Sequence, residues 1–335
     1  MPITLPVVET VKPDTATLLP FAEYDRVLVG YSGGKDSTAL VAWALERFAP
    51  DRIELMHQDV DGGSPFMDWP CTPNYVRAVA AALGLKVRFQ WKVGGFEGEM
   101  CRRDRKTNPI RFELEDGSVK EVGGTRGKNA TRERFPQVSP DLSVRWCSGY
   151  LKIHCAERAL NNDPALATGK YLFLTGERRE ESANRARYAR TLLHSCHSES
   201  RLVHHHRAVI DWTEADVWAA HRALGIVPHP AYRLGYPRLS CQHCIFQDRD
   251  QAATNRAISP VAFRRLREYE DRWGVTIKRD RTLDQLADAG TPYPEAGDAA
   301  LVALALDPHY AETVTVDPVH WRHPAGAFKR GGGPT

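Results

Sequence analysis

The stretch RVLVGYSGGKDSTAL, residues 26–40, decides the fold. Its apolar start, 26–31, predicts a buried strand, and its end, from Thr38 to Leu45, predicts a helix. The glycine-rich turn between them predicts an anion site, because backbone N–H groups and a helix N-terminus attract phosphate. Lys35 adds a cation, and Asp36 can help to hold Mg²⁺ or to orient a donor. The predicted cradle consists of Ser32, Gly33, Gly34, Lys35, Asp36 and Ser37.

Apolar segments alternate with helical ones along most of the chain. Strands are expected at 53–57, ending at Asp59, and at 87–93, 171–174 and 208–210. Further helices are expected at 75–83 and 149–160, from about Glu180, and after Thr213 as the cap. This order predicts an α/β fold, a Rossmann-like parallel sheet with helices on both faces.

The length of 335 residues predicts about two domains. We expect a flexible arm at 1–20, a nucleotide-binding domain at 21–215 and a mostly helical C-terminal region at 216–335. With 45 basic and 42 acidic residues, the chain is too balanced to indicate nucleic-acid binding, although a local basic patch is compatible with it. No apolar run has the length of a membrane span and the N-terminus lacks a signal-peptide pattern, so we expect a cytoplasmic protein without a membrane partner.

The segment 94–145 interrupts the α/β rhythm. Residues 110–114 and 119–122 flank the turn 115–118 and predict a hairpin. Two interpretations remain, a solvated insertion or an anion-binding surface that overhangs the glycine-rich loop and would bind nucleic acid. The basic residues of the segment are Arg102, Arg103, Arg105, Lys106, Arg126, Lys128, Arg132 and Arg134.

The loop matches neither G-x-x-x-x-G-K-[ST] nor G-x-G-x-x-G. The string GYSGGKDSTAL resembles the PP-loop of ATP pyrophosphatases. Segments over roughly 25–290 resemble, in the same order, the phosphoadenosine phosphosulfate (PAPS) reductase-like branch of that superfamily. These segments are Asp59 at a strand end, RWCSGYLK at 145–152, TGERREESANR at 175–185, DWTEADVW at 211–218 and SCQHC at 240–244.

The resemblance implies which residues would hold ATP and Mg²⁺. Asp59, Gly176 and Arg178 follow predicted strands, so they should converge at the carboxyl edge of the sheet. On spacing alone, Glu181 and Arg185 would instead form a surface pair on a helix. Beyond the loop, the implied cofactor-binding residues are Asp59, Lys152, Gly176, Arg178, Glu181 and Arg185. The expected catalytic residues are Lys35, Asp36 and Arg178, which would position phosphates and neutralise developing charge.

Cys241 and Cys244 have the C-x-x-C spacing of metal ligands. The resemblance adds Cys147, and together they resemble the 4Fe–4S pattern of iron–sulfur sulfonucleotide reductases and of DNA phosphorothioation enzymes. Those reductases have adjacent cysteines upstream, whereas Ser148 follows Cys147 here. A zinc site and unmetallated thiols are the alternatives.

A fourth cysteine ligand would come from Cys155 or Cys196. On one continuous helix, Cys147 and Cys155 would be about 12 Å apart. Cys155 can therefore serve only if its helix begins after Cys147, and we favour an open iron site with three cysteines.

The leading hypothesis for function is an ATP-dependent sulfurtransferase that cleaves ATP to AMP and pyrophosphate and adenylates a substrate for sulfur insertion. DNA phosphorothioation is the best-matched subclass, and the implied partner is a sulfur donor such as a cysteine desulfurase. The alternatives are a sulfonucleotide reductase and a non-catalytic nucleotide-binding subunit. A reductase is disfavoured because this family uses a C-terminal cysteine and no cysteine follows Cys244 here. The run His204–His206 is either polar filler beside a strand or a transition-metal site.

Overall fold

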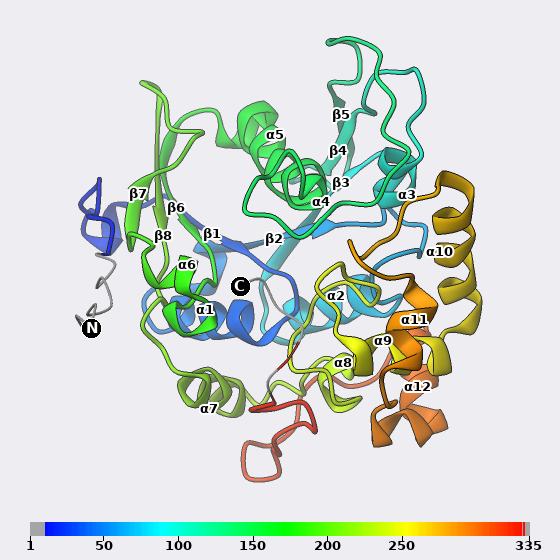
Figure 1. Ribbon diagram of the computed structural model, residues 1–335. Coiled ribbons are helices and arrows are strands. Elements are labelled where there is room, and N and C mark those ends of the chain that lie inside the picture. The colour runs from blue at the N-terminus through cyan, green and yellow to red at the C-terminus, as the bar shows by residue number, and fades with distance from the viewer. Residues whose placement is uncertain (1–10, 330, 332–335) are drawn as a thin grey trace, which may run out of the picture.

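Eight strands of the described residues form one sheet in the order β5-β4-β3-β2-β1-β6-β8-β7 (Figure 1). The computed structural model describes residues 11–329 and 331. Five strands run parallel: β1 (Arg26–Gly30), β2 (Ile53–Asp59), β3 (Lys86–Lys92), β6 (Gly169–Leu174) and β8 (Arg201–His206). The edges are antiparallel: the hairpin β4 (Ile110–Glu113) and β5 (Val119–Val122) on one side, and β7 (Thr191–Leu193) on the other. The predicted α/β fold is confirmed, and the predicted hairpin extends the main sheet.

Helices cover both faces of the sheet (Figure 1). On one face lie α1 (Lys35–Leu45), α2 (Thr72–Ala82) and α7 (Glu214–Leu224), and on the other lies α5 (His154–Asn162). Thr213 caps α7 as predicted, since its hydroxyl accepts the Asp216 N–H. The remaining helices are α3 (Gly95–Met100), α4 (Trp146–Ser148), α6 (Ala183–Ala186), α8 (Pro230–Arg233), α9 (Arg249–Ile258), α10 (Pro260–Trp273), α11 (Leu283–Asp288) and α12 (Ala299–Leu306).

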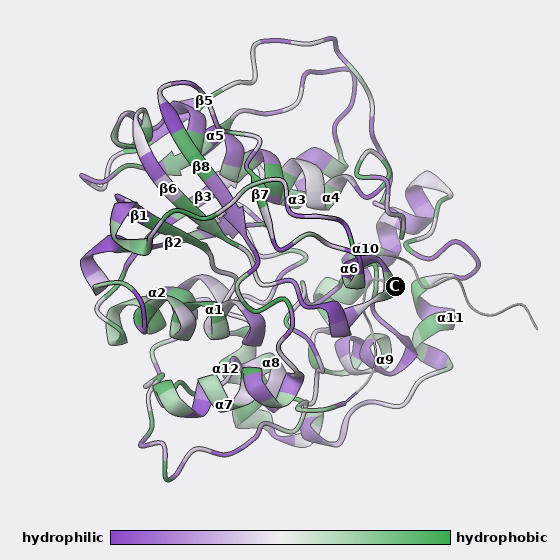
Figure 2. Ribbon diagram, turned by 90° about the vertical axis from the view of Figure 1, so that its left-hand side faces the viewer, coloured by the Kyte–Doolittle hydropathy of each residue, from purple (hydrophilic) through white to green (hydrophobic). Residues whose placement is uncertain are grey.

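Successive residues of the central strands pack in different hydrophobic cores, because side chains of a strand alternate between the two faces of the sheet. Val27 and Val29 of β1 pack with Leu40 of α1 in one core, and Leu28 packs with Leu160 of α5 in the other. All five side chains are fully buried. Figure 2 shows hydrophobic residues along β1 and β2, as expected for strands covered on both faces.

A third core joins the C-terminal helices to the loops at the end of the sheet. Phe263 of α10 and Leu286 of α11 share it with Met67 and with Trp146 of α4. The helical C-terminal region is therefore as predicted, and it packs on the segment that contains Cys147. No helix among the residues described is long and apolar enough to cross a membrane.

The prediction of a strand at 208–210 is wrong. The strand is β8 (Arg201–His206), and 208–210 form a turn after it. Three histidines in a row conceal the strand pattern in the sequence, because histidine is usually counted as polar.

The histidine run lies inside β8, where hydroxyl groups satisfy its rings. His204 contacts Tyr24 at 2.6 Å, His205 contacts Thr175 at 2.6 Å, and His206 contacts Thr191 at 2.9 Å. Burial lowers the pKa of both His205 and His206 to about 4, so both rings are neutral near pH 7. These contacts favour the interpretation as polar filler.

The described part of the expected N-terminal arm is anchored near β7. The Lys12 N–H donates to the Arg187 carbonyl at 2.9 Å, and the Thr15 N–H donates to the Thr191 carbonyl at 3.1 Å. Residues 1–10 of the arm and 332–335 of the glycine-rich tail lie outside the described residues.

A buried charge network fixes β2, β3 and the segment after α5. Arg88 donates from Nε to Glu54 at 2.6 Å and also pairs with Asp163. The three side chains are 9%, 3% and 2% exposed, so water screens them little. Removing the arginine would leave two buried carboxylates without their partner.

We expect Arg88→Met to lower the free energy of unfolding by about 3–5 kcal/mol, measured by urea denaturation. The matched control is Arg111→Met, because Arg111 pairs with Glu121 and both side chains are 47% exposed. The control should change stability by about 0–1 kcal/mol. Equal losses in the two variants would contradict the importance of the buried network.

Candidate functional site

The glycine-rich loop leaves β1 and turns directly into α1. Gly33 has φ +79°, and a Cβ there would lie 3.2 Å from Val76, so both conformation and space favour glycine. The Ser32 hydroxyl lies 3.3 Å from the Gly34 N–H and from the Ser37 hydroxyl. The predicted cradle residues therefore lie together at the N-terminus of α1.

Lys35 makes contacts with two segments that follow the sheet. Its ammonium group pairs with Glu214 of α7 at 2.7 Å and donates to the Pro237 carbonyl at 3.0 Å. Its backbone N–H donates to the Tyr232 hydroxyl at 2.9 Å. Lys35 therefore links the loop to α7 and to the segment before the C-x-x-C.

Asp36 and Arg178 form an ion pair across the loops after β1 and β6. The Arg178 Nε donates to Asp36 Oδ1 at 2.5 Å, and its Nη1 donates to Glu180 at 2.5 Å. Gly176 approaches the same turn, because a Cβ there would lie 3.1 Å from the carbonyl carbon of Asp36. The loops after β1 and β6 thus meet at the first turn of α1, at the edge where open α/β sheets bind ligands.

Glu181 organises the arginines of the segment that follows. It accepts the Arg178 N–H at 2.8 Å, pairs with Arg185, and lies 3.7 Å from Arg238. Glu181 and Arg185 do form the i,i+4 pair that spacing alone predicts. The short helices here, Arg179–Glu181 and α6, replace the longer helix that we expected from Glu180.

A cavity of about 60 Å³, the loop cavity, lies beside the glycine-rich loop. Lys152 lines it. Asp59 lines a different cavity, on the other side of His57 and Asp68. Its Oδ1 accepts the N–H groups of Asp61 at 3.0 Å and Gly62 at 2.9 Å. The residues lining the loop cavity are Tyr31, Ser32, His57, Gln58, Val60, Asp68, Thr72, Lys152, Leu239, Ser240 and Cys241.

The three cysteines singled out by spacing and resemblance line one cavity of about 190 Å³, the cysteine cavity. Cys147 reaches it from α4, and Cys241 and Cys244 reach it from the loop before α9. Lys152 and Cys241 line the loop cavity as well. The two cavities therefore share a cation and a thiol.

The charges in these cavities influence one another. Burial lowers the Lys152 pKa, but the nearby Cys241 and Asp68 raise it by more, so its net pKa is raised. Burial raises the pKa of Cys147 to about 11 and that of Asp68 to about 7. Lys152 is therefore charged and Cys147 is a neutral thiol at neutral pH when no metal is bound.

Neither proposed fourth ligand lines the cysteine cavity. The helical stretch runs from Trp146 to Asn162 and includes a π-helical segment at 149–153, so Cys155 is on the same stretch as Cys147. Cys155 is fully buried, with its thiol 3.6 Å from the Tyr150 carbonyl. Cys196 packs instead in the core beneath α5.

The donor chemistry of the cysteine cavity fits a thiolate-bound metal or cluster, since three thiols face one space. No group of three or more His, Cys, Asp or Glu side chains in the described part of the chain is already drawn together around a single metal position. For Mg²⁺, which binds through phosphates and one or two carboxylates, Asp36 supplies a carboxylate at the loop, where Arg178 also contacts it. Asp59 uses one carboxylate oxygen, Oδ1, to accept two N–H groups of the turn after β2.

Some of the basic residues in the segment 94–145 are buried in ion pairs, so they are not part of an anion-binding surface. Arg102 and Arg132 converge on Glu99, whose side chain is fully buried, at 3.2 and 2.9 Å. Arg102 is only 7% exposed. These two cations are structural, and only exposed members such as Arg103 are available to an anion.

Sequence reasoning missed Asp68, Tyr232 and Leu239. Asp68 and Leu239 line the loop cavity, and Tyr232 holds the loop through its hydroxyl. The position of Leu239 two residues before Cys241 is the one signal that could have found it. Asp68 and Tyr232 belong to no pattern in the sequence.

We expect Gly176→Ala to weaken ATP binding by tenfold or more, on the order of 1.4 kcal/mol, because the added methyl would push the Asp36 backbone away. Isothermal titration with ATP measures it. Gly297→Ala is the control, since a Cβ at Gly297 meets nothing within 4 Å. Unchanged affinity in Gly176→Ala would show that this close approach does not shape the nucleotide site.

Comparison with known proteins places these features in a family. A phage relative, an uncharacterized 37.8 kDa protein in the gpa 5' region of Escherichia phage 186, is 27% identical over 267 residues, or 75% of this chain and 76% of that one. An adenosine 5'-phosphosulfate reductase of Burkholderia cepacia is 38% identical over 72 residues, 22% of this chain and 27% of the reductase. The chain thus spans about a quarter of that reductase.

A solved structure, phosphoadenylyl-sulfate (PAPS) reductase from Candida auris in a phosphate complex, matches with 14% identity and a TM-score of 0.36 over 67% of this chain and 84% of that one. The profile of the phosphoadenosine phosphosulfate reductase domain matches residues 26–247, which include the loop, the strand ends, Cys147 and the C-x-x-C. The chain therefore belongs to the phosphoadenosine phosphosulfate reductase domain family.

Proposed function

We propose that the protein is an ATP-dependent sulfurtransferase that cleaves ATP to AMP and pyrophosphate. The observation that carries the proposal is the pair Lys152 and Cys241, which line the loop cavity and the cysteine cavity together. A nucleotide held by the loop would place its phosphates next to a thiol and a cation. This juxtaposition suits sulfur transfer to an activated phosphate or acyl adenylate.

The residues of the loop would position the nucleotide for attack. An acceptor oxygen attacks the α-phosphorus, the bond to the bridging oxygen of the β-phosphate breaks, and pyrophosphate leaves. Sulfide-level sulfur from the donor then attacks the activated group of the acceptor, and AMP leaves with the acceptor's oxygen. The amides of the loop and the charge of Lys152 would stabilise the developing negative charge. Arg178 would hold Asp36 in place to bind Mg²⁺, and Lys35, through its pair with Glu214, would fix the loop.

Cys147, Cys241 and Cys244 would hold a 4Fe–4S cluster, with zinc as the alternative. When bound, a cluster with one iron free of cysteine would supply a site for sulfide. Lys152 would neutralise the negative charge of the thiolates. Ser148 directly follows Cys147, and the positions of Cys155 and Cys196 support a set of three cysteines.

An anionic acceptor is supported by a basic cavity of about 520 Å³. Arg145, Arg185 and Phe246 line this cavity and the cysteine cavity alike, so the two spaces are neighbours. Arg145 lies over the Phe246 ring at 5.9 Å, which presents a guanidinium beside an aromatic face. A nucleic-acid backbone is the acceptor that we propose, with a cysteine desulfurase as sulfur donor.

The second candidate is a sulfonucleotide reductase, favoured by the segment similar to the Burkholderia cepacia reductase. With two electrons from an added dithiol reductant, which would be oxidised to its disulfide, it would convert adenosine phosphosulfate bound at the same loop to sulfite and AMP without forming pyrophosphate. Product analysis separates the two reactions.

We expect α-labelled ATP to yield labelled AMP, with unlabelled pyrophosphate, when the protein is incubated with a DNA oligonucleotide and sulfide. Arg178→Lys should lower the rate by about 10²-fold, because lysine cannot reproduce the fork that holds Asp36. The control is Arg179→Lys, since Arg179 pairs with the exposed Asp211. ADP as the product would contradict the proposal, and sulfite from adenosine phosphosulfate would favour the reductase.

Iron and sulfide analysis after anaerobic purification tests the cluster. Cys147→Ala and Cys241→Ala should lose iron and labile sulfide, whereas Cys155→Ala and Cys196→Ala should retain them, because only the first pair lines the cysteine cavity. Stoichiometric zinc without labile sulfide would rule out the cluster. Loss of the cluster in Cys155→Ala or Cys196→Ala would rule out the three-cysteine version.

A further inference from the structure

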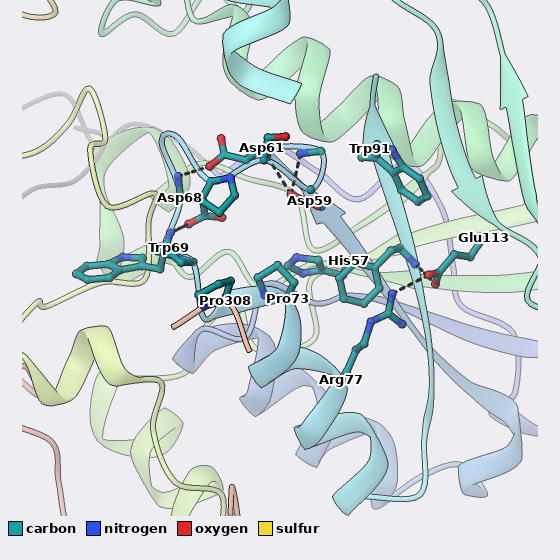
Figure 3. A pocket seen from close by; sticks show the side chains of 16 residues that line it. His57, Asp59, Asp61, Asp68, Trp69, Pro73, Arg77, Trp91, Glu113 and Pro308 are labelled. Atoms are coloured by element: carbon teal, nitrogen blue, oxygen red, sulfur yellow. Dashed lines mark hydrogen bonds and ion pairs between the residues drawn. The ribbon is translucent and has the colours of Figure 1, made fainter. Parts of the chain in front are cut away.

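A separate cavity of about 340 Å³ lies between the loop that follows β2, the N-terminal half of α2, and β3 (Figure 3). We call it the acidic cavity. His57 and Asp68 line both this cavity and the loop cavity, so they form part of the wall between them. The sulfurtransferase proposal assigns no ligand to this space.

The polar groups around the acidic cavity are mostly hydrogen-bond acceptors. Asp61 is 6% exposed, and its Oδ2 accepts the N–H groups of Phe66, Met67 and Asp68 at 2.7 to 2.9 Å. Its other oxygen, Oδ1, is buried and has no hydrogen-bond partner in the described residues. A buried acceptor without a partner is unfavourable, so this oxygen points to a missing donor.

His57 adds a further acceptor. Its Nδ1 lies 2.9 Å from the Tyr31 carbonyl, which can only accept, so Nδ1 carries the proton. The unprotonated Nε2 therefore remains as an acceptor. Asp59 and Asp68 contribute carboxylates to the same lining.

Trp91 forms an aromatic wall of the acidic cavity (Figure 3). Phe89 also lines the cavity, and Trp69 lines it while its ring packs edge-on against Tyr236. One cation of the protein already packs on an aromatic ring of this cavity. Arg77 lies over the Phe89 ring at 3.7 Å and pairs with Glu113 at 2.7 Å.

Arg77 is the cation among the lining residues and is compensated by Glu113. Lys152, which lines the neighbouring loop cavity, offsets the charge of Asp68. Asp59 and Asp61 therefore remain as carboxylates that no cation among the described lining residues compensates.

We propose that the acidic cavity binds a small organic cation, an ammonium or guanidinium group on an apolar body, that donates to Asp61. Charge-assisted hydrogen bonds to the carboxylates and contact with the Trp91 ring would hold it. A metal ion fits less well, because no three or more potential ligands in the described ranges surround one metal position. The site is independent of the sulfurtransferase reaction and does not require it.

Titration calorimetry with agmatine, which has a guanidinium and an ammonium group, tests the proposal on the full chain. Asp61→Asn keeps a carbonyl oxygen for the three backbone N–H groups but places an amide where Oδ1 is. We expect its agmatine affinity to fall by about tenfold or more. The matched control Asp51→Asn, an exposed aspartate outside the cavity, should bind as the wild type does.

Trp91→Leu provides a second test if Asp61→Asn does not fold, and it should also weaken agmatine binding because an aromatic wall is lost. Wild-type affinity in folded Asp61→Asn, or no agmatine binding to the wild type, would overturn the proposal. Binding of Mg²⁺ alone that Asp61→Asn abolishes, without agmatine binding, would overturn it in favour of a metal site.

Discussion

The close approach of Gly176 to the backbone of Asp36 is the constraint on which the site depends. It brings the loop after β6 against the first turn of α1, and a Cβ at Gly176 would lie 3.1 Å from the Asp36 carbonyl carbon, so any larger residue would have to push the two loops apart. The ion pair between Arg178 and Asp36 then joins the same two loops. Because β1 and β6 are neighbours in the sheet, this contact fixes the edge at which the glycine-rich loop can receive phosphates.

The C-terminal helices position part of the site through their packing against the segment that contains Cys147. α10 and α11 bury apolar side chains against α4, and the C-x-x-C loop is held beside Cys147 at the edge of that core. Tyr232 and Glu214 contact Lys35, so residues 197 and 179 positions later in the chain fix the glycine-rich loop. The loop cavity and the cysteine cavity therefore share walls, although their residues are far apart in sequence.

The sequence predicts the sheet and the loop well because local patterns decide them. The strand 26–31 and the glycine run that follows it need no tertiary information. β8 was misplaced because neutral, buried histidines do not look apolar in a sequence. Arg102 was misread because the buried Glu99 that binds it is visible only once the chain is folded. Lys35 points to Glu214 because α7 lies against α1, which spacing does not reveal.

The central claim is that the nucleotide and cysteine cavities form one site, and thiol labelling tests it most directly. Metal-free protein would be treated with N-ethylmaleimide with and without ATP, and the labelled cysteines identified by mass spectrometry. We expect ATP to protect Cys241, which lines both cavities, and to leave Cys101 unchanged, since it lies outside them. Equal labelling of Cys241 with and without bound ATP would contradict the account.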